Sequence, residues 1–136
     1  MAIDSDYKDF DYPSLAGTLL FWEKAQEEFE SENIIDRKQA CEKAYRAATE
    51  AIDLLLAKFG FYIPVGHPEA HALRSNSIVE LIDVIPEMKQ LDFYYSTFKD
   101  KLHGLGFYSG FDATRYKKIF IQVEEFISLV QRVLQE

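Results

Sequence analysis

The chain has 136 residues, of which 48% are apolar and 28% are charged, and its net charge is −8. These proportions exclude a disordered chain and fit a single domain with an ordinary hydrophobic core. Its one cysteine, Cys41, cannot form an internal disulfide bond, and no apolar run reaches the roughly 20 residues of a membrane span, so we expect a cytoplasmic protein without a membrane anchor.

The negative charge is unevenly placed along the chain. Residues 1–36 hold ten acidic and two basic side chains, whereas the two signs cancel over residues 37–136. We therefore predict a flexible acidic arm over residues 1–13 and a helical domain over residues 14–136. The acidic surplus does not favour RNA binding, because phosphate contacts depend on clustered Lys and Arg. RNA stays an open partner only because residues 89–118 hold a local excess of lysine.

Two long amphipathic helices are predicted in the first half of the chain. Pro13 and Ser14 begin the first helix, and Ser31 to Asn33 interrupt it. Its apolar residues recur at spacings of three and four: Leu15, Leu19, Trp22, Ala25 and Phe29. The second helix spans residues 34–59, with Gly60 as a C-terminal stop. Its stripe is rich in alanine, which allows close helix approach: Ala40, Ala44, Ala47, Ala48, Ala51, Leu55 and Phe59. Cys41 lies beside this stripe, and we interpret it as a core thiol.

Three further helices follow, over residues 69–85, 87–103 and 112–135. Pro86 separates the third from the fourth, and the glycines at 104, 106 and 110 end the fourth. The fifth has the clearest apolar face: Tyr116, Ile119, Phe120, Val123, Phe126, Ile127, Val130 and Leu134. No strand-like alternation is present. The chain is therefore predicted to be all-α, an up-and-down helical bundle of four to five helices.

Candidate chemistry centres on His103, which lies at a helix end beside glycines and two aromatic residues. A histidine in this setting either transfers protons near neutral pH or is a hydrogen-bonded packing residue. With Lys99 and Tyr108 it forms the candidate catalytic cluster. The candidate contacts for an anionic ligand are Lys101, Arg115 and Lys118.

No metal or cofactor site is predicted. His67 and His71 have the spacing of two ligands on one helix face, but Pro68 lies between them and no further ligand has matching spacing. Phosphate-cradling glycine motifs and a nucleophile elbow are both missing. We therefore expect no metal and no cofactor.

Three short segments resemble the HEPN superfamily, and most closely its archaeal PaREP-like branch. Residues 40–51, ACEKAYRAATEA, are similar to the pattern QA(S)EKxWxAAxxA of that branch. Residues 102–110, LHGLGFYSG, are similar to its LHxNFYEG segment, and residues 71–73, HAL, to the HxL opening of the third helix. The resemblance covers roughly residues 14–135. It implies a helical bundle that dimerises and that pairs with a nucleotidyltransferase in toxin–antitoxin or defence systems.

Catalytic HEPN proteins are metal-independent RNases with an R-x4–6-H motif. Counting back from His103, the arginine would stand at position 96, 97 or 98, but these residues are Ser96, Thr97 and Phe98. Lys99 is one residue too close, and a lysine does not replace the forked guanidinium of arginine on a phosphate. Because the motif is degenerate, we expect a chain that is not an enzyme.

The sequence therefore predicts a non-catalytic HEPN-like bundle that acts through self-association, as a homodimer, or through a protein partner, which the resemblance suggests is a nucleotidyltransferase. Two alternatives stay open. One is a metal-independent RNase that uses His103, and the other is a protein that binds a nucleotide or another anionic ligand.

Overall fold

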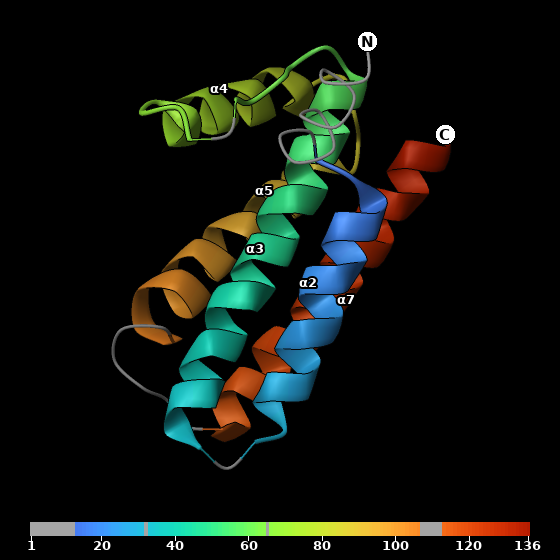
Figure 1. Cartoon of the computed structure of the whole chain (residues 1–136). Helices are drawn as coiled ribbons and strands as arrows, with labels where there is room; N and C mark the ends of the chain where they lie inside the picture. Colours follow the sequence, from blue (N-terminus) through green and yellow to red (C-terminus); the bar gives the residue numbers. More distant parts are fainter. Residues whose placement is uncertain (1–12, 32, 65, 107–112) are drawn as a thin grey trace, which may run out of the picture.

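The computed structural model of the chain describes residues 13–31, 33–64, 66–106 and 113–136. Every regular element in these ranges is helical: α2 (Leu15–Phe29), α3 (Ile34–Lys58), α4 (Ala70–Ile82), α5 (Met88–Phe98), the π-helix η1 (Lys99–Gly106) and α7 (Ala113–Gln135). Helices α2, α3, α5 and α7 run along the length of the molecule, and α4 lies across one end (Figure 1). The predicted all-α fold is confirmed. The predicted arm, residues 1–13, falls almost entirely outside the described residues.

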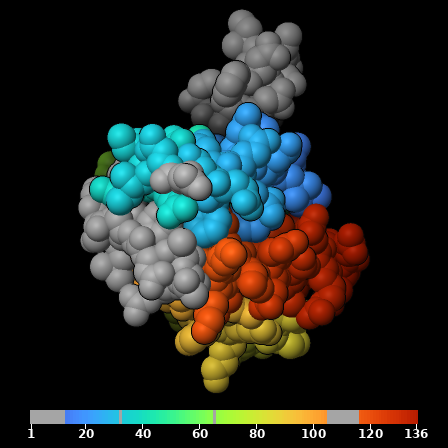
Figure 2. Space-filling view, turned by 90° about the horizontal axis from the view of Figure 1, so that it is seen from below, coloured from blue at the N-terminus to red at the C-terminus, as the bar shows by residue number. Residues whose placement is uncertain are grey.

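Contacts between the helix ends show the up-and-down order. The backbone N–H of Ser14, at the start of α2, donates to Glu50 Oε1 in the second half of α3, at 3.0 Å, so these two helices are antiparallel. Lys58 Nζ, at the end of α3, lies 3.4 Å from the carbonyl oxygen of Val133, near the end of α7. Helices α3 and α7 therefore finish at the same end of the bundle. Figure 2 shows α7 at the surface, between α2 and the α5 segment.

The helix boundaries follow from local capping. Ser14 Oγ accepts a hydrogen bond from the N–H of Gly17 at 2.9 Å, and Asn33 Oδ1 accepts one from the N–H of Ile35 at 2.8 Å. Each bond satisfies a backbone donor that the first turn of a helix leaves without a partner. Gly60 follows α3 with φ of +93°, a conformation that favours glycine. The predicted start of the first helix and stop of the second are confirmed.

The core lies where the alanine stripe of α3 meets the aromatic residues of the other helices. The five stripe alanines are at most 2% exposed: Ala40, Ala44, Ala47, Ala48 and Ala51. Phe120 of α7 stacks on Phe29 of α2 with ring centroids 4.3 Å apart and lies 5.5 Å from Trp22. Phe126 of α7 lies 5.4 Å from Phe98 of α5. Cys41 is completely buried, which confirms it as a core thiol, and burial raises its pKa to about 12.

The buried face of α2 differs from the predicted one. Leu15 and Leu19 are 40% and 43% exposed, whereas Thr18, Trp22 and Ala25 are buried. Thr18 can be buried because its Oγ1 donates a hydrogen bond to the carbonyl oxygen of Ser14 at 3.0 Å. Trp22 and Ala25 are buried as predicted, but the centre of the buried face lies closer to Thr18, by a rotation of about 30°, and the two leucines lie at its exposed edge.

The fourth predicted helix is divided in the structure. Its α-helical part ends at Phe98, and residues Lys99–Gly106 continue as the π-helix η1. A π-helix contains one more residue per hydrogen-bonded turn, and such segments are frequent at functional sites. Leu102 of η1 is fully buried, so the wider turn still contributes to the core. The third helix ends at Ile82 instead of residue 85, but Ile85 remains buried in the turn that follows.

Candidate functional site

His103 is held by two side chains of α3. Its Nδ1 lies 2.9 Å from Glu42 Oε2, and its ring stacks on Tyr45 with centroids 4.9 Å apart and planes 25° apart. When Glu42 is ionised it accepts the proton of Nδ1, which orients the imidazole and favours one tautomer. The side chain is about one-third exposed. His103 is therefore positioned by contacts 61 residues away along the chain.

Tyr45 also contacts a side chain of α5. Tyr45 stacks on Tyr95 with centroids 5.9 Å apart, and the two hydroxyl oxygens lie 3.1 Å apart. The Tyr95 hydroxyl is also 3.0 Å from Thr49 Oγ1. Burial raises the pKa of Tyr95, so its phenol stays protonated and available as a donor at neutral pH. These hydrogen bonds tie α3 to α5 beside His103.

A buried ion pair joins α3 to α4 next to the tyrosines. Arg74 is only 6% exposed. Its Nε lies 2.6 Å from Asp53 Oδ1, and its Nη2 lies 2.9 Å from Asp53 Oδ2, which is a bidentate pair. Burial raises the pKa of Asp53, and the hydrogen bonds and positive charge of Arg74 partly oppose this effect.

His71 connects the ion pair to the basic residues predicted from the sequence. Its Nδ1 is 3.5 Å from Arg74 Nη1. Partial burial lowers the pKa of His71, and the positive charges of Arg74, Lys99 and His103 lower it further. His71 of α4 therefore lies within electrostatic reach of three groups: the guanidinium of Arg74, also in α4, and the side chains of Lys99 and His103 in η1.

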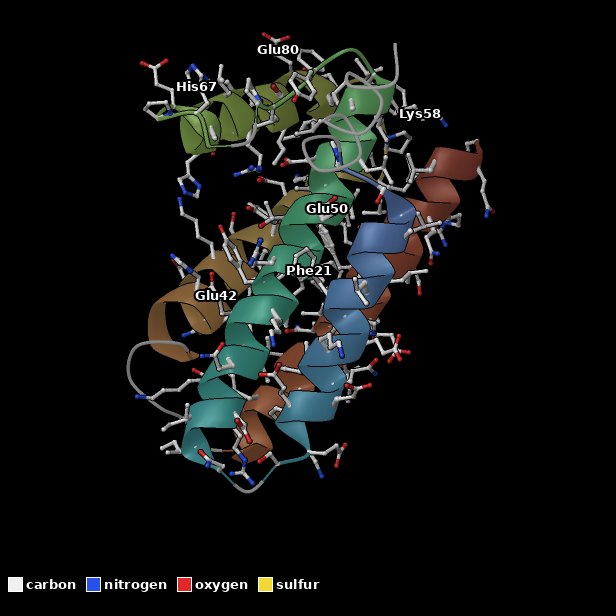
Figure 3. All side chains as sticks on the ribbon, viewed as in Figure 1. Phe21, Glu42, Glu50, Lys58, His67 and Glu80 are labelled. Atoms are coloured by element: carbon white, nitrogen blue, oxygen red, sulfur yellow. The ribbon has the colours of Figure 1, made fainter. Side chains whose placement is uncertain are left out.

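Two cavities open on either side of Arg74 and His71. The larger, of about 360 Å³, lies toward α3 and includes Arg46, Glu50 and His67 in its lining. Figure 3 shows Glu50 and Glu42 on α3, and His67 in the turn that precedes α4. Burial raises the pKa of Glu50, and its hydrogen bond from Ser14 opposes the rise. This cavity presents both charge signs.

The smaller cavity, of about 230 Å³, lies between α4 and α5. Arg74, His71 and Lys99 contribute positive or titratable groups to it. Ser75 and Ser96 contribute hydroxyl groups, and two acids oppose the positive charge: Asp92 and Asp100. This cavity is smaller and more polar than an ordinary ligand pocket.

The remaining predicted site residues are placed only in part. Lys101 of η1 is half-buried, and Lys118 is exposed on α7. Tyr108 and the side chain of Arg115 fall outside the described residues. His103 and Lys99 both lie within electrostatic reach of His71. The structure adds neighbours that sequence reasoning missed, namely Glu42, Tyr45, Tyr95 and the Arg74–Asp53 pair.

His67 and His71 have separate roles. His67 Nδ1 accepts a hydrogen bond from the N–H of Glu69 at 3.0 Å, in the turn before α4, whereas His71 faces Arg74.

Within the described part of the chain, no group of three or more His, Cys, Asp or Glu side chains is arranged to hold a metal ion. The same residues contain no helix long and apolar enough to cross a membrane.

The outward side of α7 is a second distinctive surface. Ile121 is 57% exposed and stands between two grooves, and both it and Glu124 line each of them. The groove toward α2, of about 290 Å³, has an apolar floor of Trp22, Phe29 and Phe120. The groove toward α5 is about 650 Å³ in volume and contains Tyr94 and Leu129. Most of its other lining residues are polar or charged, so only the groove toward α2 is apolar. An exposed apolar residue beside an apolar groove with a charged rim resembles the apolar centre and polar rim of a protein interface.

Comparison with protein-family models, with curated proteins and with solved structures finds no match to this chain.

Proposed function

We propose that this chain is a non-catalytic helical-bundle protein that acts through self-association. The observation that carries the proposal is the outward side of α7, where the exposed side chain of Ile121 stands between two grooves, one of which has the apolar floor of Trp22, Phe29 and Phe120. Two leucines of α2, Leu19 and Leu20, are exposed as well. Burying such a surface against a partner removes apolar area from water, which favours association.

The neighbourhood of His103 supports a structural role for the imidazole. Glu42 and Tyr45 hold its ring, and Arg74 already gives two hydrogen bonds to Asp53. Phe98 occupies one of the positions where a catalytic HEPN protein has its arginine, and it is fully buried in the core. These contacts favour a non-catalytic member if the resemblance to HEPN proteins reflects common descent.

The oligomeric state of the purified protein tests the proposal. We expect sedimentation equilibrium between about 1 and 100 µM to show a reversible homodimer, an affinity range usual for weak to moderate protein interfaces. A species that remains monomeric throughout this range would contradict self-association. Co-expression with a nucleotidyltransferase encoded beside the chain then tests the partner that the resemblance suggests.

Binding of an anionic ligand is a second candidate, because Arg74, His71 and Lys99 line the smaller cavity together. Under this alternative, nucleotides at low salt raise the melting temperature, and Lys99→Ala removes most of the increase. Lys89→Ala is the matched control, since Lys89 is an exposed lysine of α5. An unchanged melting temperature with every nucleotide would exclude this candidate.

An RNase assay separates both candidates from the catalytic alternative. Under the proposed function, the purified protein leaves labelled RNA intact, and His103→Ala behaves in the same way. Cleavage by the wild type that His103→Ala abolishes would instead establish an RNase in which His103 acts on the RNA.

A further inference from the structure

Four charged residues flank Ile121 on the exposed side of α7 in a symmetric pattern. Lys117 and Lys118 precede it, and Glu124 and Glu125 follow it; all four side chains are exposed. The positive pair and the negative pair are thus nearly equidistant from Ile121 along the helix. Such a pattern cannot pair Lys117 with Glu124, or Lys118 with Glu125, within one helix, because residues seven apart are separated by about 10 Å along its axis.

The helical positions divide the four charges into two sides. At 3.6 residues per turn, Lys117 and Glu124 lie about 40° and 60° to one side of Ile121, and Lys118 and Glu125 lie at similar angles on the other side. The contacts agree with this division. Lys117 lines the groove toward α2, and Glu125 Oε2 accepts a hydrogen bond from the hydroxyl of Tyr94 of α5 at 2.9 Å, whereas Glu124 reaches both grooves.

We infer that a second copy of this chain packs against α7 in antiparallel orientation, with the two-fold axis passing beside Ile121. A two-fold axis perpendicular to the plane of two antiparallel helices keeps each residue on its own side and reverses its height. Lys117 then faces Glu124 of the partner subunit, and Lys118 faces the partner's Glu125. The two Ile121 side chains meet at the axis.

Charge complementarity favours a second copy over an unrelated occupant. The α7 surface is complementary to itself only in the antiparallel orientation, since a parallel arrangement at the same register places lysine opposite lysine and glutamate opposite glutamate. In the antiparallel dimer each ion pair occurs twice, on either side of the contact between the two Ile121 side chains. This inference rests on the proposed self-association and specifies its interface.

Charge reversal tests the inference by sedimentation equilibrium. We expect Glu124→Lys to weaken dimerisation at least about tenfold, because the introduced ammonium group would face the partner's Lys117 at two symmetric positions. The double variant Lys117→Glu plus Glu124→Lys exchanges the charges and is expected to restore the dissociation constant to within about threefold of the wild type. Glu80→Lys is the matched control, since Glu80 is an exposed residue of α4 and its substitution makes the same change of net charge.

The outcomes separate the two proposals. A dimer that persists unchanged in Glu124→Lys overturns the α7 interface, whereas self-association stands. A wild-type chain that is monomeric at all concentrations overturns both. Failure of the double variant to recover overturns the antiparallel register. Far-UV circular dichroism of each variant verifies that the helices remain, and Ile121→Asp provides an independent variant that places a charge on the axis and is expected to abolish the dimer.

Discussion

At the scale of single residues, the ion pair between Arg74 and Asp53 governs how α4 is attached to α3. Both side chains are nearly buried, at 7% and 14% exposed. Arg74→Ala leaves the Asp53 carboxylate without its partner in a poorly solvated place, so we expect a loss of about 3 to 5 kcal/mol in the free energy of unfolding. Urea denaturation followed by circular dichroism measures the loss.

A double variant separates the cost of an unpaired charge from the worth of the pair itself. Arg74→Met combined with Asp53→Leu removes both charges and keeps most of the side-chain volume, so it should recover most of the lost stability. Lys99→Ala serves as the control for removal of an exposed positive charge. A double variant as unstable as Arg74→Ala would show that packing by the arginine stem, and not the charge, accounts for the effect.

The carboxyl group of Glu50 predicts a pH dependence. Burial raises its pKa above the usual value of 4.5 in the folded protein. The folded state therefore holds this proton more tightly than the unfolded state, and its contribution to stability is present below pH 4.5 and lost as the pH rises through the raised pKa. Glu50→Gln keeps an oxygen for the Ser14 N–H and cannot ionise. We expect this variant to gain stability relative to the wild type as the pH rises from about 4 to about 7.

Thermal unfolding at several pH values measures this difference. Glu80→Gln, at an exposed site of α4, is the control. If the difference between the wild type and Glu50→Gln does not change with pH, the carboxyl group of Glu50 is solvated and its pKa is not raised by burial.

The residues around the candidate site show why only part of it could be predicted. His103 could be selected because it stands beside glycines and aromatic residues, and Lys99 because it lies nearest to the arginine position of the HEPN motif. Glu42, in contrast, lies 61 residues from His103, and Asp53 lies 21 residues from Arg74. Pairing over such distances depends on how helices pack, and the local spacing of polar residues does not contain that information. Tyr95 was not selected from the sequence, and its place in the site depends on Tyr45 and Thr49 of another helix, which satisfy its hydroxyl inside the bundle.

At the scale of elements, local capping signals determine where α2 and α3 begin. Ser14→Ala removes the acceptor for the N–H of Gly17, so we expect a loss of about 1 kcal/mol in the free energy of unfolding. Ser14→Thr retains a hydroxyl acceptor and should lose less. Thermal unfolding checks both variants, and equal losses would indicate that the hydroxyl of Ser14 does not contribute as a cap.

The periodicity of apolar residues predicted the helices better than it predicted their rotation or regularity. The alanine stripe of α3 is buried as expected, because small residues permit close packing along the whole helix. On α2 the stripe is rotated, since a threonine whose hydroxyl bonds to its own backbone can be buried in place of a leucine. The π-helix η1 has no simple signature, because widening of a turn depends on how Leu102 and His103 meet α3.

At the scale of the whole molecule, the order of the helices followed from the sequence because short connections favour antiparallel neighbours. The position of α4 across one end did not follow, since it depends on the Arg74–Asp53 pair and on the long connection between α3 and α4. The interface proposed on the outward side of α7 was not predicted from the sequence. Lys118 on that side was predicted only as a contact for an anionic ligand, and the grooves beside Ile121 become visible only when the helices are packed.

One hydrophobic core extends through all the helices, and it predicts how the molecule unfolds. Trp22 of α2, the single tryptophan of the chain, is 8% exposed and packs near Phe120 of α7, so its fluorescence reports on contact between these helices. Far-UV circular dichroism reports on all helices together. Because buried residues of α2, α3, α4, α5, η1 and α7 belong to the same cluster, we expect both signals to change at the same urea concentration.

Self-association adds a dependence on protein concentration. A dimer that dissociates on unfolding is stabilised by mass action, so a tenfold increase in protein concentration should move the shared midpoint to higher urea. The Glu124→Lys variant should show coincident signals with a midpoint less dependent on concentration. If fluorescence instead changes before circular dichroism, α2 separates from α7 while the other helices remain, and the bundle is not a single cooperative unit.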